Sequence, residues 1–238
     1  MLDIAQYMVM NRNFTAICAA MLMCAILIVF IGSVSLNKSE LSFADAAQQK
    51  EIYLTFDDGP SDRVTPKILD ILKEENVKAT FFIVGKSAEK RKTLLKREFD
   101  EGHSIGVHSY THRYKEIYAS PQSLIKDIDR CNELIKEVCG RKAALYRFPG
   151  GSYGLSSRLV SAVSAHGMKY VDWNASFRDS EILSPSPEQL ITAAKSTVAN
   201  PKKIVMLAHD STDKSATAEA LKSVIMHFKN EGYIFKAL

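Results

Sequence analysis

Two histidines and two aspartates occur in patterns that could form a metal site. His108 and His112 lie four positions apart in HSYTH, and Asp57 and Asp58 are adjacent in TFDDGP. Spacing of i, i+4 places two histidines on one face of a helical turn, a spacing found in helical zinc sites. Two histidines and one carboxylate form a three-ligand site that keeps a position for water, as catalytic metal sites do. The histidine spacing alone is a weak signal, and the aspartates strengthen it.

The two adjacent aspartates are expected to have different roles. Neighbouring side chains in an extended segment point in opposite directions, so one aspartate could bind a metal while the other faces a bound water. The alternative interpretation is structural. An aspartate could cap a helix predicted around residues 65–76, and Gly59-Pro60 is a turn signal.

The elements that must position these residues are short strands alternating with helices. Seven apolar runs rich in Ile, Val, Phe and Tyr predict strands at 52–56, 79–84, 104–107, 144–148, 169–173, 203–208 and 233–236. Helical periodicity occurs between several of them, in segments that contain Ile68–Leu72, Leu124–Val138 and Leu221–Phe228. Such alternation indicates a parallel sheet covered by helices. About seven strands fit a compact, incomplete βα barrel, and a doubly wound open sheet is the alternative.

Polar residues lie where these predicted strands end. Asp57-Asp58 follow the first run, His108 follows the third, Arg147 lies within the fourth, and His209-Asp210 follow the sixth. The carboxyl ends of parallel strands meet at one face, where catalytic residues usually lie. The pattern therefore predicts a single site built from several strands.

Composition excludes several classes of protein. The chain has 238 residues, of which 24% are charged and 46% hydrophobic, unlike a disordered or collagen-like chain. Its net charge of +4 is too small to indicate nucleic-acid binding. The four cysteines form no CxxC or Cys/His cluster, so a structural zinc site is not expected.

The amino-terminal part contains one long apolar run. Residues 14–36 carry no charge, and 23 residues in a helix span roughly 34 Å, enough to cross a bilayer. We expect a short segment 1–13, an anchor at 14–36, a linker at 37–50 and one catalytic domain at 51–238. We expect a single-pass membrane protein with an extracellular domain, although the flanking charges Arg12 and Lys38 do not by themselves fix this orientation. The alternative is secretion after cleavage near Ala44-Asp45-Ala46, an A-x-A pattern.

Four motifs in order resemble those of a known family. TFDDGP (55–60), HSYTH (108–112), RFPGG (147–151) and LAHD (207–210) closely resemble the polysaccharide deacetylases, the NodB-homology or carbohydrate esterase family 4 group. The resemblance runs from about Ile52 to the carboxyl terminus. It implies a distorted (β/α)7 barrel that hydrolyses N-acetyl groups of amino-sugar polymers.

The resemblance also implies a role for each motif residue. Asp58, His108 and His112 would bind one divalent metal, zinc in most cases and cobalt or nickel in others. Asp57 would be the general base, and Arg147 would orient it. A metal at such a site lowers the pKa of its water toward about 7, which supplies the nucleophile for amide hydrolysis.

The acid and its partner are implied in the same way. His209 resembles the general acid that protonates the leaving amine. A further family motif is commonly Asp-Trp, whose aspartate bonds to this histidine. Its best match here is Asp179-Ser180, without the tryptophan, and Asp172-Trp173 is the second choice.

Three residues are expected to contact substrate. Leu207 would line the acetyl pocket, and the backbone N–H of Gly150 would help to hold the oxyanion. The family usually has an aromatic residue at the position of Gly150, so the side chain that would line the sugar cleft is missing. Trp173 could be a platform for a sugar ring or could pack in the core.

The sequence thus predicts a monomeric, metal-dependent deacetylase of a cell-wall amino-sugar polymer, with peptidoglycan N-acetylglucosamine as the preferred substrate. The changes at Gly150 and Ser180 motivate a first alternative, a catalytically weak module that binds wall glycan. A second is hydrolysis of a chitin-like oligosaccharide or another small amide on the same scaffold.

Overall fold

The computed structural model describes residues 49–238. Lys50–Leu238 form one compact unit. The predicted anchor at 14–36 lies outside the described residues, as does almost all of the linker. Within the described part of the chain, no helix combines the length and apolar character needed to cross a membrane.

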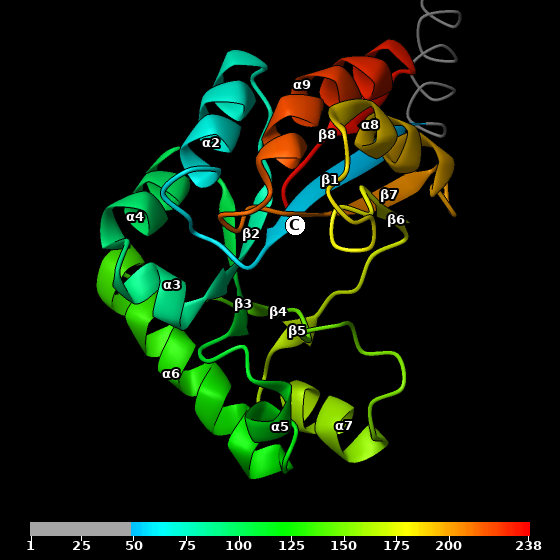
Figure 1. Cartoon of the computed structure of the whole chain (residues 1–238). Helices are drawn as coiled ribbons and strands as arrows, with labels where there is room; N and C mark the ends of the chain where they lie inside the picture. The colour runs from blue at the N-terminus through cyan, green and yellow to red at the C-terminus, as the bar shows by residue number, and fades with distance from the viewer. Residues whose placement is uncertain (1–48) are drawn as a thin grey trace, which may run out of the picture. The chain divides into compact units, whose positions relative to one another are not determined.

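The unit is built on one sheet of parallel strands (Figure 1). The strands are β1 (Lys50–Asp57), β2 (Thr80–Val84), β3 (Ser104–Ser109), β4 (Leu145–Tyr146), β5 (Lys169–Tyr170), β6 (Ala175–Ser176), β7 (Lys203–His209) and β8 (Tyr233–Phe235). Their order is β5-β4-β3-β2-β1-β7-β6, and β8 pairs with the start of β1. Every pairing in the described residues is parallel.

This order distinguishes between the two predicted architectures. Starting at β1, the strands follow the chain through β5 on one side, and the other side continues from β7 to β6. That is the order of a singly wound barrel, interrupted between β5 and β6. The fold is therefore an α/β half-barrel, consistent with a distorted (β/α)7 barrel and different from a doubly wound sheet.

Helices connect the strands and cover the sheet (Figure 1). They are α2 (Thr65–Glu74), α3 (Gly85–Glu89), α4 (Lys92–Asp100), α5 (Tyr114–Ile117), α6 (Pro121–Cys139), α7 (Ser157–Ala165), α8 (Pro187–Ser196) and α9 (Ser215–Asn230). The three predicted helical segments correspond to α2, α6 and α9. The short α3 and α5 were not predicted, and neither were α4, α7 and α8.

All seven predicted strands exist, but two of them are much shorter than their apolar runs. β4 has two of the five residues predicted at 144–148, and β5 has two of the five at 169–173. β6 was not predicted, because Ala175–Ser176 is too short to carry an apolar pattern. This strand exists through its pairing with β7, where Ser176 lies opposite Leu207.

Side chains of the central strand β1 alternate between the two faces of the sheet. In β1, Leu54 and Phe56 are buried, and alternation puts Thr55 and Asp57 on the opposite face. In the register of β1 with β7, Asp57 lies opposite His209. The ladder therefore brings two predicted catalytic residues to the same end of the sheet.

Helix α6 is the longest helix in the described residues, and both of its ends are capped. At its start, the hydroxyl of Ser120 accepts a hydrogen bond from the Ser123 N–H at 3.1 Å, and Pro121 occupies the first turn. At its end, Gly140 adopts a left-handed conformation with φ of 79°. One face of the helix packs into the core through Leu124, Ile128, Cys131, Leu134 and Ile135.

We predict that Ser120→Ala destabilises the domain by about 1 kcal/mol, because the helix loses its side-chain cap. For a domain of this size the midpoint of thermal unfolding should fall by about 2–4 °C. Ser156→Ala is the matched control, since Ser156 precedes α7 but makes no side-chain capping bond. Calorimetry of both variants checks this. Equal losses in the two variants would contradict the assigned cap.

Candidate active site

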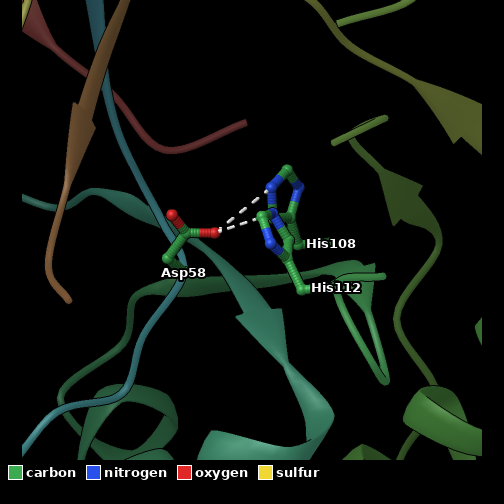
Figure 2. Close-up of side chains that lie close together, drawn as sticks. All are labelled: Asp58, His108 and His112. Carbon is green, nitrogen blue, oxygen red and sulfur yellow. Dashed lines mark ion pairs between the residues drawn. The ribbon is translucent and has the colours of Figure 1, made fainter. Parts of the chain in front are cut away.

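Three side chains converge at the carboxyl end of the sheet (Figure 2). Oδ1 of Asp58 lies 3.5 Å from Nε2 of His108 and 3.1 Å from Nε2 of His112. Asp58 follows β1, and His108 lies near the end of β3. One potential ligand atom from each residue lies within 4.8 Å of the others. The structure thus brings together the three residues predicted to bind a metal.

The protonation of His108 suits metal binding. Its Nδ1 lies 2.9 Å from the carbonyl oxygen of Arg147, which can only accept, so Nδ1 carries the proton. Nε2 is therefore left with a lone pair that faces Asp58. Burial lowers the pKa of His108 to about 3, so the ring is neutral at pH 7. Metal-bound histidines are typically oriented by this kind of hydrogen bond to a carbonyl.

Asp58 supplies a second observation that fits a cation. Its Oδ1 is buried and has no hydrogen-bond partner among the described residues. A buried carboxylate oxygen without a partner is costly, and a bound cation would remove that cost. Asp58, His108 and His112 together form an oxygen and nitrogen donor set that suits zinc and similar divalent metals.

The segment HSYTH does not form the predicted helical turn. His108 and Ser109 belong to β3, and the chain then crosses an irregular loop before α5 begins at Tyr114. His112 has φ of 55° and Asp58 has φ of 77°, both in the left-handed region. Each such non-glycine residue costs roughly 1–2 kcal/mol, so neighbouring contacts must hold the loop. The carboxylate of Asp127 on α6 provides such contacts and was not predicted.

Asp57 forms a buried ion pair with Arg147. The Nη1 of Arg147 lies 3.0 Å from Oδ1 of Asp57, and both side chains are almost wholly removed from solvent. Burial raises the pKa of Asp57, while the charge of Arg147 lowers it. Asp57 therefore points toward Arg147 and Asp58 toward the histidines, so the two adjacent aspartates have separate partners.

Three further hydrogen bonds hold the Arg147 guanidinium. Nε donates to the Val171 carbonyl at 2.9 Å, Nη1 to the Thr55 hydroxyl at 2.6 Å, and Nη2 to the Asp172 carbonyl at 3.4 Å. Its charge also lies 4.2 Å from the centre of the Phe82 ring. These contacts fix the guanidinium, and thereby Asp57.

His209 is paired with Asp179. Nδ1 of His209 donates to Oδ1 of Asp179 at 2.7 Å, and the His209 backbone N–H donates to Oδ2 at 2.8 Å. Burial lowers the pKa of His209, but the hydrogen bond and charge of Asp179 outweigh burial and raise it to about 9. Asp172 accepts instead from the backbone N–H and the hydroxyl of Ser152. The partner of His209 is therefore Asp179 and not Asp172.

Asp179 is itself held by residues that sequence reasoning missed. The hydroxyl of Thr217 donates to its Oδ2 at 2.7 Å, and Nζ of Lys214 donates to its backbone carbonyl at 3.0 Å. Lys214 directly precedes α9 and Thr217 lies in its first turn, and no local sequence pattern links either residue to Asp179. Because the pKa of His209 is about 9, its ring carries a proton on each nitrogen at neutral pH, and Asp179 accepts the proton on Nδ1.

The turn after β1 is fixed against the end of β7. The backbone N–H of Asp210 donates to the Asp57 carbonyl at 3.1 Å. A Cβ atom on Gly59 would lie 2.1 Å from the carboxylate of Asp210, so any side chain at this position would collide with it. Gly59 is therefore required for close approach of the two segments, which goes beyond the predicted turn signal.

The predicted substrate contacts lie around these groups. Leu207 is buried on β7 and shares a face with His209. The Trp173 ring lies 5.7 Å from the charge of Arg147 and against Gly151. Gly150 has φ of 79°, and a Cβ atom there would lie 3.3 Å from the hydroxyl of Tyr114.

Tyr114 is an aromatic residue beside the site that sequence reasoning missed. Its ring packs edge-on against His112 at 5.4 Å, yet 47% of the residue is exposed. An exposed aromatic ring thus lies next to Gly150, the position at which an aromatic side chain was expected to be missing.

We predict that nuclear magnetic resonance titration of the His209 ring gives a pKa near 9, and that Asp179→Asn lowers it below about 6.5. The reason is that burial remains while the stabilising charge is lost. Asp129→Asn, which alters the exposed pair of Asp129 with His166, serves as control and should leave His209 unchanged. An unchanged His209 pKa in Asp179→Asn would contradict this assignment.

Comparison with known proteins relates this geometry to a family. The polysaccharide deacetylase family model matches residues 44–171. A peptidoglycan-N-acetylglucosamine deacetylase of Bacillus cereus is 31% identical over 86% of this chain and 75% of its own length. The peptidoglycan-N-acetylmuramic acid deacetylase PdaA of Bacillus subtilis is 33% identical over 85% of this chain and 75% of its own.

Solved structures agree with the sequence matches. A Streptococcus mutans CE4 esterase superposes with a TM-score of 0.75 at 33% identity, covering 80% of this chain and 86% of that chain. A CE4 family pseudoenzyme from Bacillus anthracis also superposes, with a TM-score of 0.70 at 26% identity, over 80% of this chain and 64% of that chain. The sequence matches, the half-barrel and the motif residues gathered at its carboxyl end agree, and the chain belongs to the polysaccharide deacetylase family, carbohydrate esterase family 4.

Proposed function

We propose that this protein is an active, metal-dependent N-deacetylase of peptidoglycan, with N-acetylglucosamine as the preferred sugar. The observation that carries the proposal is the simultaneous presence of a metal-type donor set, a carboxylate held by a buried arginine, and a protonated histidine held by a carboxylate. A module that only binds glycan needs none of the proton-transfer groups.

Asp58, His108 and His112 would hold the metal. A divalent metal there would supply a Lewis acid that activates water and polarises the amide carbonyl. We propose zinc as this metal, and cobalt or nickel would suit the same donors. His108 is already presented as a neutral ligand by the Arg147 carbonyl.

The remaining residues move protons and hold charge. Asp57 accepts one proton from the attacking water as the new C–O bond forms, and Arg147 keeps its carboxylate in place. Asp179 stabilises the His209 imidazolium before the transfer, and His209 then donates the proton on Nε2 to the leaving amine as the C–N bond breaks. The backbone N–H of Gly150 donates to the developing oxyanion, and Leu207 lines the acetyl pocket. Acetate and a free amino sugar are the products.

We also propose where the reaction takes place. The uncharged run at residues 14–36 is long enough to anchor the chain in a membrane, which would hold the catalytic domain near the wall polymer on the outer side. The relatives from Bacillus are named for peptidoglycan substrates, which supports the wall as the location of the substrate.

The decisive experiment measures acetate release by the full-length chain in detergent. Substrates are purified peptidoglycan and N-acetylglucosamine oligomers, each assayed with chelator or with added Zn²⁺ or Co²⁺. We expect metal-dependent release that disappears in Asp58→Ala. In Asp57→Asn we expect kcat to fall by roughly 10²–10⁴-fold, because the base is lost. Asp129→Asn, which alters only an exposed ion pair with His166, should keep full activity.

Three further results would identify the substrate and decide between the alternatives. Mass spectrometry of the digested wall identifies whether N-acetylglucosamine or N-acetylmuramic acid has lost its acetyl group. Binding of metal-loaded protein to peptidoglycan without acetate release would contradict the proposed enzyme and favour the glycan-binding module. Acetate release from small amides alone would favour the second alternative, hydrolysis of a small amide on the same scaffold.

A second prediction concerns the dependence of activity on pH. His209 must be protonated to act as acid, and its pKa of about 9 predicts that kcat/KM falls as the pH rises above that value. In Asp179→Asn the decline should begin at a lower pH, since the raised pKa depends on Asp179. A profile whose alkaline limit is the same in both proteins would exclude His209 as the acid.

A further inference from the structure

One carboxylate binds the loop that connects the two histidine ligands. Oδ2 of Asp127 accepts from the Ser109 hydroxyl at 2.6 Å and from the Tyr110 backbone N–H at 2.6 Å. Oδ1 accepts from the Thr111 backbone N–H at 3.0 Å. The three donors belong to consecutive residues, and these are the three residues between His108 and His112.

The carboxylate also reaches His112 through a single hydroxyl. The backbone N–H of His112 donates to the Ser109 Oγ at 2.8 Å, and that same hydroxyl donates to Asp127. His112 has the left-handed φ of 55°, which is uncommon for residues other than glycine. Its position is therefore imposed by this chain of hydrogen bonds and not by helix formation.

The surroundings of Asp127 indicate that the loop is its main partner. The side chain is nearly buried on the inner face of α6, next to Ile128, whose side chain is fully buried. Within residues 49–238, no lysine, arginine or histidine forms an ion pair with it. A carboxylate is an acceptor only, and charged hydrogen bonds of this kind are roughly twice as strong as neutral ones.

We propose that Asp127 is a positioning residue of the metal site, and that it sets the separation of His108 and His112 before a metal binds. The inference rests on the metal site of the proposed function. His108 lies within β3, between two residues that pair with β2, and its ring is held by the Arg147 carbonyl, whereas His112 lies in neither a helix nor a strand. Asp127 links that loop to a capped, well-packed helix, so the ligand geometry depends on a side chain that contacts no ligand atom.

Asp127→Asn tests the proposal with almost no change in size. The amide keeps one acceptor oxygen, but its NH2 group then faces an N–H or O–H donor, so at least one contact is lost. The full-length chain is freed of metal, and the dissociation constant for Zn²⁺ is measured by competition with a chelating dye. The unfolding midpoint of the metal-free protein is recorded beside it.

We expect Zn²⁺ binding to weaken by about 10–100-fold in Asp127→Asn, as for other groups that orient metal ligands. The visible spectrum of bound Co²⁺, which reports ligand geometry, should change as well. Asp129→Asn is the matched control, because it makes the same substitution on the same helix at an exposed ion pair. It should bind Zn²⁺ like the unaltered protein.

The outcomes separate this inference from the proposed function. If Asp127→Asn lowers the unfolding midpoint but binds Zn²⁺ with unaltered affinity and an unaltered Co²⁺ spectrum, Asp127 is only structural and the inference is wrong. Failure of the unaltered chain to bind any metal would instead overturn the proposed function, and the inference with it.

A second variant covers the case in which Asp127→Asn does not fold. Ser109→Ala removes the hydroxyl between Asp127 and His112 but leaves the contacts to the Tyr110 and Thr111 N–H groups. It should weaken Zn²⁺ binding several-fold. Unaltered affinity in Ser109→Ala would contradict the proposed link.

Discussion

A guanidinium group removed from water must have its charge balanced and its N–H groups hydrogen-bonded, or the fold loses several kcal/mol. Arg147 meets this constraint with the carboxylate of Asp57 and with the carbonyls of Val171 and Asp172. Those carbonyls lie in the gap between β5 and β6, where the barrel is interrupted. The interruption therefore provides acceptors that a continuous ladder would have used. Because the Arg147 carbonyl also orients His108, one residue connects the proposed base with the proposed metal ligands.

Much of the fold could be predicted because its main signals are local. The apolar runs at 52–56 and 203–208 have the composition of buried strands, and both form the central ladder. Polar residues that follow such runs must lie at the carboxyl end of a parallel sheet, which is why Asp57, His108 and His209 could be assigned to one site. The resemblance of the four motifs to a known family supplied the other predictions, namely which residues act as acid, base and metal ligands.

The parts of the structure that could not be predicted from the sequence depend on contacts between distant segments. The predicted helical turn in HSYTH was wrong because its conformation is set by Asp127, fifteen residues after His112, and not by its own spacing. One signal was available, since Asp127 is a charged residue on the helix face that contains Leu124 and Ile128. Tyr114 and Thr217 had no comparable signal. β6 was missed because two residues without an apolar pattern become a strand only beside β7.

The two histidines His108 and His209 are held in opposite charge states by their surroundings. Burial keeps His108 neutral down to a pH of about 3, and Asp179 keeps His209 cationic up to about 9. Well inside these limits neither resting ring changes its charge as the pH changes. The charges that the two rings present to a bound molecule are therefore the same in weakly acidic and in neutral surroundings. The fold thus fixes the charge of both rings, and any change of activity with pH between about 3 and 9 must come from other titratable groups.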